Sequence, residues 1–496
     1  MRRREFDRDL LPPGDGQTLL VDGEWRTSRE LFDVHDPATL EVIGSAADGT
    51  VDEARAAGES AVAAFDGWRG LAAEERSARL RRGLDTIRER SEPLARLLSL
   101  ENGKPFREAH GEILRGAAML EWGIEEGRRV YGRVTPSSSG TRGVVLTSPV
   151  GPALVITPWN FPASMLMRKM GLSLSAGSPV IAKPAEQTPL IAVAIAKILN
   201  EFLPAGVVNV VTTSQPGAVV DELMKNPRIR KVTFTGSTEV GLRLLRTPTS
   251  ILKRVSLELG GHTPAIVFPD ADVEAAIDSI MTAKFANAGQ SCISINRLFV
   301  HSDVRDEVVA GLRERIGRLQ IGHGFDEETS IGPLIDANGL EKVERHVADA
   351  RERGAEVLAG GSRWHPDDAT LRGEFFEPTL LAGVDESMII SKEETFGPVL
   401  PVFEFTDDDD VIAQANNTTY GLSAYVFGAD FDVLWGAMER LEFGVIGVNE
   451  VMPNRPELPF GGFKNSGQGR EGGNEGIEDY VETKAVAIRT GRGRIM

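Results

Sequence analysis

Between residues 153 and 269 the chain alternates short apolar runs with amphipathic stretches, and this alternation limits the possible fold more than any other feature. Its predicted strands are ALVITP, SPVIAKP, VVNVVTT, KVTFTG, SLELGG and AIVFP, and its predicted helices are SMLMRKMGLSLSAG, LIAVAIAKILNEF, VVDELMKN and EVGLRLLR. Strands without a polar face that alternate with helices predict a parallel sheet covered on both sides. The predicted fold class is therefore α/β, with the Rossmann-like architecture of dinucleotide-binding domains.

A second α/β unit is predicted after residue 292, where RLFVH, EVLAGG, EPTLLAGV, VLPVFEF, LSAYVFG and GVIGVNE read as strands between helices. A chain of 496 residues has room for two or more domains, and we place the boundary near Gly260 and Gly261. Upstream, residues 18–49 read as short strands and residues 51–131 as helices. The tip Ser137–Gly140, between two β-like runs, predicts an exposed hairpin or arm.

The charge balance argues against several classes of partner. The formal net charge is −18 and the pI is about 5.0, which disfavours binding to nucleic acid. No apolar run is long enough to span a bilayer, and the basic start of the chain is not followed by the apolar segment of a secretory signal. We therefore expect a cytoplasmic protein without a membrane partner. The seven histidines show no ligand spacing, so no metal is expected.

Cys292 is the only cysteine in the chain, so it has no internal disulfide partner. A lone cysteine is most often a buried small hydrophobe. Here its flanks, Ala-Gly-Gln-Ser and Ile-Ser-Ile-Asn, are small and polar, which leaves room for a substrate and exposes backbone N–H groups beside the sulfur. Such dipoles favour the thiolate, which is a strong nucleophile. Cys292 is therefore a candidate catalytic nucleophile.

Two segments are candidates for binding a dinucleotide. Residues 234–241, FTGSTEVG, join a strand to a helix with glycines at Gly236 and Gly241, and such a turn admits a phosphate to the helix N-terminus. In VIAKPAEQTP, Lys183 and Glu186 would grip ribose hydroxyls at the edge of a parallel sheet. Each has a simpler alternative, an ordinary turn in the first case and a surface salt bridge in the second.

Three further segments carry polar groups in apolar surroundings. Asn160 in TPWNFP would donate to a developing oxyanion, or it is simply an asparagine in a turn. Glu258 in LELGG either caps a backbone site or has a raised pKa and serves as a base. Glu394 and Phe396 in EETFGP would hold a ribose and a flat ring, or only pack.

Together these segments resemble the aldehyde dehydrogenase superfamily. TPWNFP, KPAEQTP, FTGSTEVG, LELGG, GQSC, EETFGPV and PFGGFKNSGQGRE stand in the family's order and spacing, and the resemblance extends from about Thr18 to Ile488. It implies that Cys292 attacks the aldehyde carbon, that Asn160 and the Cys292 N–H stabilise the oxyanion, and that a thioester remains after hydride transfer. It also implies that Glu258 activates the water that hydrolyses this thioester.

The resemblance also assigns the cofactor residues. Lys183 and Glu186 would hold the adenosine ribose, Trp159, Gly236 and Ser237 the pyrophosphate, with Gly241 in the same turn, and Glu394 and Phe396 the nicotinamide riboside. A carboxylate at Glu186 accepts hydrogen bonds from the ribose of NAD and repels the 2′-phosphate of NADP. We therefore expect NAD to be preferred over NADP.

The implied architecture has three parts. Residues 1–129 and 152–259 would form the NAD-binding domain, 260–470 the catalytic domain, and 130–151 with 471–496 an arm for oligomerisation. Because the family's arm adds a strand to a neighbour's sheet, we expect a homodimer or a homotetramer.

The substrate is less defined. MRKMG and GREGGNEGIEDYVETK are most similar to succinate-semialdehyde dehydrogenases, in which an arginine at the position of Arg168 binds the substrate carboxylate. That subgroup's second arginine is Ala286 here, and its second active-site cysteine is Ser294, so no disulfide switch is expected. Arg455 either supplies the missing cation or is a solvated surface residue.

Several alternatives stay open. Other candidate substrates are lactaldehyde, glycolaldehyde and aromatic aldehydes. The retention of Cys292, Glu258 and Asn160 together argues against a catalytically silent structural protein with this fold, and Glu258 favours hydrolysis over transfer of the acyl group to CoA.

Overall fold

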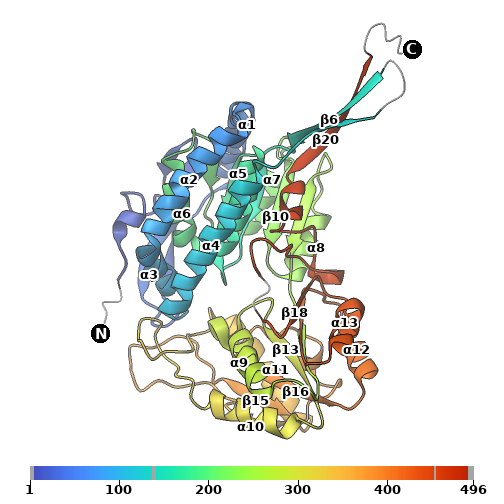
Figure 1. Cartoon of the computed structure of the whole chain (residues 1–496). Coiled ribbons are helices and arrows are strands. Elements are labelled where there is room, and N and C mark those ends of the chain that lie inside the picture. The colour runs from blue at the N-terminus through green and yellow to red at the C-terminus, as the bar shows by residue number, and fades with distance from the viewer. Residues whose placement is uncertain (1–4, 137–140, 452–453, 490–496) are drawn as a thin grey trace, which may run out of the picture.

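The computed structural model describes residues 5–136, 141–451 and 454–489. Two large sheets, each covered by helices, lie one above the other, and a three-stranded arm projects from them (Figure 1). Within the described residues, none of the helices combines the length and the apolar character needed to cross a membrane.

The first sheet has eight strands in the order β19-β11-β10-β7-β8-β9-β1-β2. Its parallel core confirms the predicted alternation and consists of β7 (Ala153–Ile156), β8 (Val180–Lys183), β9 (Val208–Val210), β10 (Lys231–Thr235) and β11 (Arg254–Glu258). The antiparallel strands at its edges are β1 (Leu19–Val21), β2 (Glu24–Arg26) and β19 (Gly467–Gln468).

Helices cover both faces of this sheet because its strands are apolar on both sides. Val155 packs into one hydrophobic core, and its neighbours Leu154 and Ile156 pack into another on the opposite face. The first core is closed by α2 (Ala73–Glu89), α3 (Ser91–Asn102), α4 (Phe106–Glu126), α5 (Pro162–Ala176) and α6 (Pro189–Asn200). The second is closed by α1 (Val51–Gly70), α7 (Pro216–Lys225) and α8 (Thr238–Arg246). Every residue of α5 is buried, because α5 lies between the sheet and α4.

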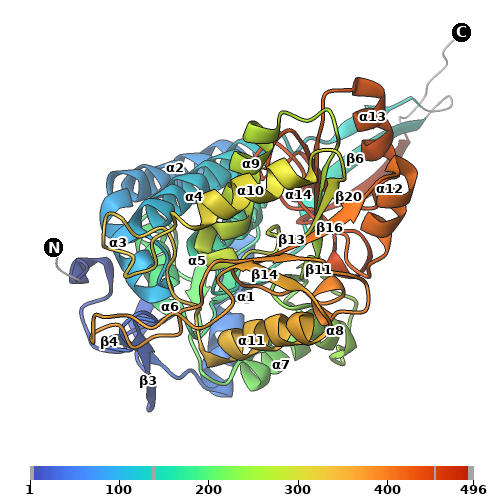
Figure 2. The same ribbon diagram turned by 90° about the horizontal axis from the view of Figure 1, so that it is seen from below.

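The second sheet has seven strands in the order β14-β15-β16-β13-β12-β17-β18. Its strands are β12 (Thr263–Val267), β13 (Ile295–His301), β14 (Glu356–Ala359), β15 (Thr379–Ala382), β16 (Val399–Phe405), β17 (Ser423–Phe427) and β18 (Val445–Val448), and β14 alone among them is antiparallel. The helices of this half are α9 (Val273–Phe285), α10 (Arg305–Ile316), α11 (Ala337–Glu352), α12 (Asp408–Asn416) and α13 (Phe431–Arg440), as Figure 2 shows.

The arm is an antiparallel sheet in the order β20-β6-β5. In it β6 (Thr141–Pro149) pairs with β5 (Arg133–Thr135) and, from Thr141 to Pro149, with β20 (Val481–Arg489). The predicted tip Ser137–Gly140 lies outside the described residues. A separate hairpin is formed by β3 (Leu31–His35) and β4 (Val42–Ala47), and the short helix α14 (Glu475–Glu478) precedes β20.

One connection was not predicted from the sequence. The glycine-rich tail after β18 returns to the first sheet, where β19 pairs with Leu257 and Glu258 at the end of β11. A strand of two residues is too short to show any periodicity, so the pattern gave no sign of it.

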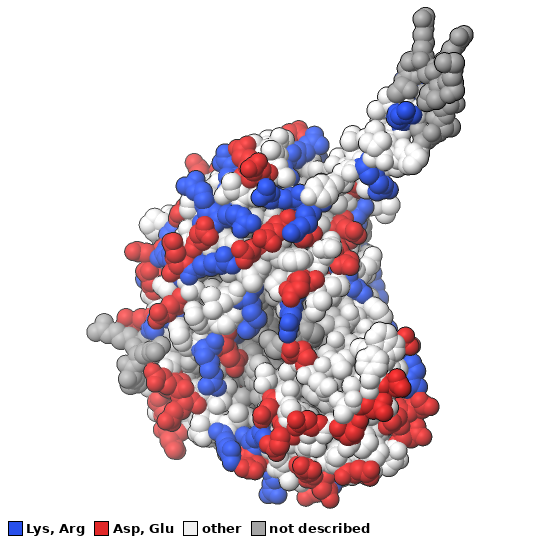
Figure 3. All heavy atoms as spheres, in the orientation of Figure 1, with Lys and Arg blue, Asp and Glu red and all other residues white. Residues whose placement is uncertain are grey.

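On the face shown in Figure 3, acidic side chains gather along the lower half, while both signs of charge are mixed over the helices above.

Candidate active site

Cys292 lies on a loop that a strained turn connects to α9. After α9 the chain forms a 3₁₀ turn, Ala286–Gly289, in which Asn287, Ala288 and Gly289 have φ values of 51°, 54° and 74°. A side chain at Gly289 would meet the carbonyl oxygen of Gly397 at 2.2 Å, so glycine is needed there. Left-handed residues other than glycine cost free energy and often occur at functional sites. This turn leaves Cys292 half-buried.

Asn160 lies against the same loop. It follows β7, and its Nδ2 donates a 3.0 Å hydrogen bond to the carbonyl oxygen of Gln290, two residues before the cysteine. Its Oδ1 accepts a 3.0 Å hydrogen bond from the N–H of Phe161, which fixes which end of the amide faces the loop. Since an amide nitrogen carries two N–H groups, the second is available for an oxyanion. The structure thus brings the predicted oxyanion donor to the loop of the predicted nucleophile.

The surroundings of the Cys292 thiol favour its protonated form. Burial raises its pKa to about 12, with further increases from the carboxylates of Glu394 and Glu258. The Cys292 backbone N–H and Arg168 lower the pKa, but by less. The backbone N–H thus favours the thiolate as expected, but the loss of water and two nearby carboxylates outweigh it.

Glu258 ends β11 with its side chain buried. Among the described residues neither of its carboxylate oxygens has a hydrogen-bond partner. Burial raises the pKa of Glu258 well above its usual range, the negative charge of Glu471 raises it further, and Lys169 and Arg168 oppose the shift. Of the two alternatives drawn from the sequence, the structure shows no backbone cap by this carboxylate and agrees with the raised pKa, while the role as a base stays a prediction.

Behind Glu258 lies a buried ion pair that sequence analysis missed. Lys169 on α5 pairs with Glu471, and both side chains are fully buried. Thr233 on β10 joins them, because its Oγ1 accepts from Lys169 Nζ at 3.0 Å and donates to Glu471 Oε1 at 3.1 Å. Two adjacent cations inside the apolar helix α5 were the available signal, whereas Glu471 stands in a glycine-rich tail that gave none.

Arg168, the neighbour of Lys169, is a buried cation beside the nucleophile and the base. Its Nη2 donates to Oδ1 of Asn454, and its guanidinium lies 4.9 Å from the centroid of the Phe460 ring. Nε and Nη1 have no hydrogen-bond partner within the described part of the chain. Burial lowers the pKa of Arg168, and the negative charges of Glu471, Glu258 and Cys292 oppose that shift.

Arg455, unlike Arg168, is not buried. Its side chain is exposed and forms a 3.0 Å ion pair with Glu450. This arrangement favours the alternative that Arg455 is a solvated surface residue. Ala286, which stands where the resembled subgroup has a second arginine, begins the turn before Cys292 and offers no charge.

Glu394 also acts on the nucleophile, because its carboxylate raises the pKa of Cys292, and Phe396 lies two residues further along the chain. Oε1 of Glu394 accepts a 2.9 Å hydrogen bond from the N–H of Gly261, and burial raises the pKa of Glu394 to about 7. Phe396 has a φ of 57° and meets Trp159 edge to face, with 5.5 Å between the ring centroids. Residues from the two halves of the chain are thus joined next to Cys292.

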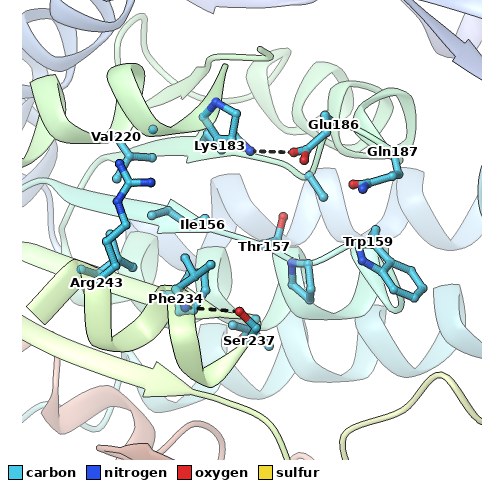
Figure 4. A pocket seen from close by; sticks show the side chains of 18 of the residues that line it. Ile156, Thr157, Trp159, Lys183, Glu186, Gln187, Val220, Phe234, Ser237 and Arg243 are labelled. Atoms are coloured by element: carbon cyan, nitrogen blue, oxygen red, sulfur yellow. Dashed lines mark hydrogen bonds and ion pairs between the residues drawn. The ribbon is translucent and has the colours of Figure 1, made fainter. Parts of the chain in front are cut away.

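Five of the eight predicted dinucleotide residues line an open pocket at the carboxyl ends of β7, β8 and β10 (Figure 4), namely Trp159, Lys183, Glu186, Gly236 and Ser237. Lys183 and Glu186 face it as an ion pair of 3.2 Å. On the opposite wall, Gly236 and Ser237 lead into α8, and Ser237 caps that helix by accepting from the N–H of Val240 at 3.2 Å. Trp159 closes one end.

Two residues of this region differ from expectation. Gly241 is buried and packs on Leu259, which a side chain at Gly241 would approach to 2.5 Å, and it is not among the residues that line the pocket. Arg243, on the exposed side of α8, does line the pocket and pairs with Asp221 at 3.5 Å. Sequence analysis missed Arg243, because an arginine on an amphipathic helix is by default a solvated residue.

The chain matches the aldehyde dehydrogenase family over residues 25–486. It is 46% identical over 476 residues to the NADP(+) succinate-semialdehyde dehydrogenase of Escherichia coli. The aligned region covers 95% of this chain and 98% of that protein. It is 44% identical over 476 residues to the glutarate-semialdehyde dehydrogenase of Pseudomonas aeruginosa, with 95% and 97% covered.

Solved structures agree. A succinate-semialdehyde dehydrogenase from Burkholderia pseudomallei superposes with a TM-score of 0.94 at 42% identity, covering 98% of this chain and 100% of that one. An NADP-dependent enzyme of E. coli gives a TM-score of 0.94 at 45% identity, with 98% and 99% covered.

The two E. coli matches correct one expectation. Both relatives are named as NADP enzymes, so the prediction that NAD is preferred over NADP is wrong. The prediction treated Glu186 as a free carboxylate that repels a 2′-phosphate. In the structure this carboxylate is paired with Lys183, which offsets its charge.

Proposed function

The chain belongs to the aldehyde dehydrogenase family, and we propose that it oxidises a short aldehyde with a carboxylate at its far end, such as succinic or glutaric semialdehyde, with NADP as cofactor. The observation that carries this proposal is Arg168. A buried guanidinium whose Nε and Nη1 have no hydrogen-bond partner among the described residues, next to Cys292 and Glu258, is suited to attract and hold a carboxylate. The names of the two E. coli relatives and of the P. aeruginosa relative agree with this substrate class and this cofactor.

The residues around Cys292 fit the chemistry of an acyl-enzyme. Sγ of Cys292 gives its proton to solvent water and bonds to the aldehyde carbon, and the carbonyl oxygen becomes an oxyanion held by Asn160 Nδ2 and the Cys292 N–H. The dinucleotide supplies the hydride acceptor when it is bound. Loss of hydride from the same carbon leaves a thioester on Cys292. Glu258 then takes a proton from water, the water oxygen attacks the thioester carbon, and the acid leaves as the sulfur regains its proton.

The open pocket fits a dinucleotide. It lies where parallel strands end and at the N-terminus of α8, the position where α/β sheets bind nucleotide phosphates. Gly236 has no side chain to fill the space beside the Phe234 ring, which a Cβ would approach to 2.4 Å. Lys183 and Arg243 line this pocket as cations, each paired with a carboxylate that also lines it, and both can donate to the 2′-phosphate of NADP. We assign residues 1–129 and 152–259 to cofactor binding and residues 260–470 to catalysis.

We also propose a homo-oligomer. The arm leaves β5 and β20 as edge strands, and it exposes Tyr131 by 75%, Val134 by 72% and Ile488 by 45%. A long arm with apolar side chains and free edges gains stability when a second copy covers it. The dimer or tetramer would be measured by light scattering after gel filtration. A cytoplasmic location stays a prediction from the sequence.

The test compares two aldehydes of equal length. NADPH formation is followed with succinic semialdehyde and with butanal, each over a range of concentrations. Because Arg168 would contact only the carboxylate, we expect kcat/KM to be at least about 100-fold higher for succinic semialdehyde. Equal values would contradict the proposed substrate class and would direct the search to hydroxy-aldehydes and aromatic aldehydes. A requirement for CoA would contradict hydrolysis by Glu258.

A further inference from the structure

A buried ion pair connects two helices behind the site to Asn160. Lys104 precedes α4 and Glu112 lies within it, and their side chains are fully buried with 2.6 Å between Nζ and Oε2. Buried charges are costly unless each is paired and hydrogen-bonded. Nothing in the chemistry described so far uses this pair, although it lies close to the loop that carries Asn160.

Each partner of the ion pair makes further contacts. Lys104 Nζ donates to the carbonyl oxygen of Asn160 at 2.7 Å and lies 4.1 Å from the centroid of the Phe161 ring. Glu112 Oε1 accepts from the N–H groups of Ala163 and Ser164 at 3.0 and 3.2 Å, at the start of α5. That helix has no side-chain cap from its own N-cap residue, Phe161, so Glu112 provides the cap from another helix.

Helix α4, which carries Glu112, also contacts the loop of the nucleophile. Glu108 lies one helical turn before Glu112, and its Oε2 accepts from the N–H of Asn287 at 2.8 Å. Asn287 Nδ2 donates in turn to the carbonyl oxygen of Asn160 at 3.1 Å. The carbonyl of Asn160 therefore receives two hydrogen bonds, one from Lys104 and one from the turn before Cys292.

From these contacts we infer that Lys104 and Glu112 are positioning residues of the oxyanion site. The ion pair holds the Asn160 backbone on one side and the N-terminus of α5 on the other. The direction of the Asn160 amide is thereby fixed relative to Cys292, and so is the helix that carries Arg168. This inference rests on the proposed role of Asn160 in binding the oxyanion.

The test measures hydride transfer directly. A single turnover of NADPH formation is recorded at saturating aldehyde and NADP for Lys104→Met, Asn160→Ala and the double variant. Because a misplaced donor loses most of its benefit in the transition state, we expect Lys104→Met to slow hydride transfer by about 10- to 100-fold. The Kd for NADPH should stay within about twofold of that of the unchanged protein.

The double variant separates positioning from general damage. If Lys104 acts through Asn160, adding Lys104→Met to Asn160→Ala should cost less than about threefold more. A hydride-transfer rate for Lys104→Met within about twofold of the unchanged protein would overturn the inference, and so would a full loss that persists in the Asn160→Ala background.

A second variant covers the case in which Lys104→Met fails to fold, since that change leaves Glu112 buried without its partner. Lys104→Met combined with Glu112→Gln removes both charges and keeps an acceptor for the α5 N–H groups. It should show the same loss of rate, and a rate near that of the unchanged protein would overturn the inference.

Glu101→Gln is the matched control. Glu101 is a buried carboxylate that caps α6 through the N–H groups of Leu190 and Ile191, so it repeats the capping contacts of Glu112, without the ion pair, at a helix that does not carry the site. It should leave hydride transfer unchanged, and an equal loss in Glu101→Gln would reduce the Lys104 effect to general damage and overturn the inference.

An assay that needs no dinucleotide, and whose substrate carries no carboxylate, separates this inference from the proposed function. Hydrolysis of p-nitrophenyl acetate by Cys292 passes through the same oxyanion, and it should fall in Lys104→Met and Asn160→Ala alike. If Asn160→Ala retains full rates in both assays, the proposed role of Asn160 fails. If Asn160→Ala is slow and Lys104→Met is not, only the positioning inference fails.

Discussion

Lys183 and Glu186 form a 3.2 Å ion pair in which the lysine side chain is 4% exposed and the glutamate side chain is 39% exposed. The buried partner is held in place, while the exposed one can turn toward water. A 2′-phosphate that enters the pocket would therefore meet a fixed cation and a carboxylate that is able to move away. This geometry supports the proposed use of NADP by a chain with a glutamate at this position.

The first prediction concerns this pair. Glu186→Gln removes the charge that repels a 2′-phosphate and weakens the acceptor for a ribose hydroxyl. We expect the ratio of kcat/KM for NADP to that for NAD to rise by about tenfold, and Lys183→Met to lower it by at least as much. Steady-state kinetics with both dinucleotides measures the ratio. Lys225→Met, an exposed lysine at the end of α7, should leave the ratio unchanged.

The second prediction concerns the acidity of Cys292. Its raised pKa, about 12, means that without dinucleotide the thiolate fraction increases with pH throughout the alkaline range. Alkylation by iodoacetamide should therefore rise about tenfold per pH unit between about pH 7 and 10. Because Cys292 is the only cysteine, the incorporated label reports this thiol alone.

Glu394→Gln is the matching variant, because the Glu394 carboxylate raises the pKa of the thiol. Its removal should lower that pKa and speed alkylation at any fixed pH below it. A rate that reaches a plateau below about pH 9 would show instead that the dipoles beside the sulfur dominate.

Much of the fold could be predicted from the sequence because it depends on local patterns. Strands β7 to β11 are short apolar runs between helices, and the same pattern places Glu258 at a strand end. The contacts that complete the site are not local. Lys104 and Asn160 are 56 residues apart, and their hydrogen bond joins a side chain to a backbone carbonyl, so no spacing rule indicates it.

Residue type alone could not decide which candidate faces the site. Arg168 and Arg455 are both arginines in segments predicted to contact the substrate, yet one is buried and the other is exposed and paired with Glu450. Gly241 stands in a glycine pattern that suits a phosphate, and in the structure it makes room for Leu259. These outcomes depend on tertiary packing, which the sequence pattern does not show.

The third prediction concerns Glu258. Glu258→Gln should keep the burst of NADPH and lower the following steady rate by about 100-fold or more, because the thioester is then hydrolysed without a base. Rapid mixing separates the two phases, and mass spectrometry would detect the acylated protein. If both phases fell equally, Glu258 would act before hydride transfer instead.

The pH dependence of the unchanged protein follows from the same residue. Burial raises the pKa of Glu258 above its usual range, and a base works only when it is deprotonated. The hydrolysis rate should therefore increase with pH through the raised pKa of Glu258 and fall as pH drops below it. In Glu258→Gln this dependence should disappear.

The last prediction concerns the two arginines. Arg168→Met removes the buried cation, and we expect KM for succinic semialdehyde to rise by about 10- to 100-fold while KM for butanal changes by less than about threefold. Arg455→Ala is the contrasting variant. Since Arg455 is exposed and paired with Glu450, we expect its removal to change both KM values by less than about twofold. If Arg455→Ala raised KM for the anionic aldehyde alone, this side chain would turn toward the substrate. It would then replace the arginine that the resembled subgroup has at the position of Ala286.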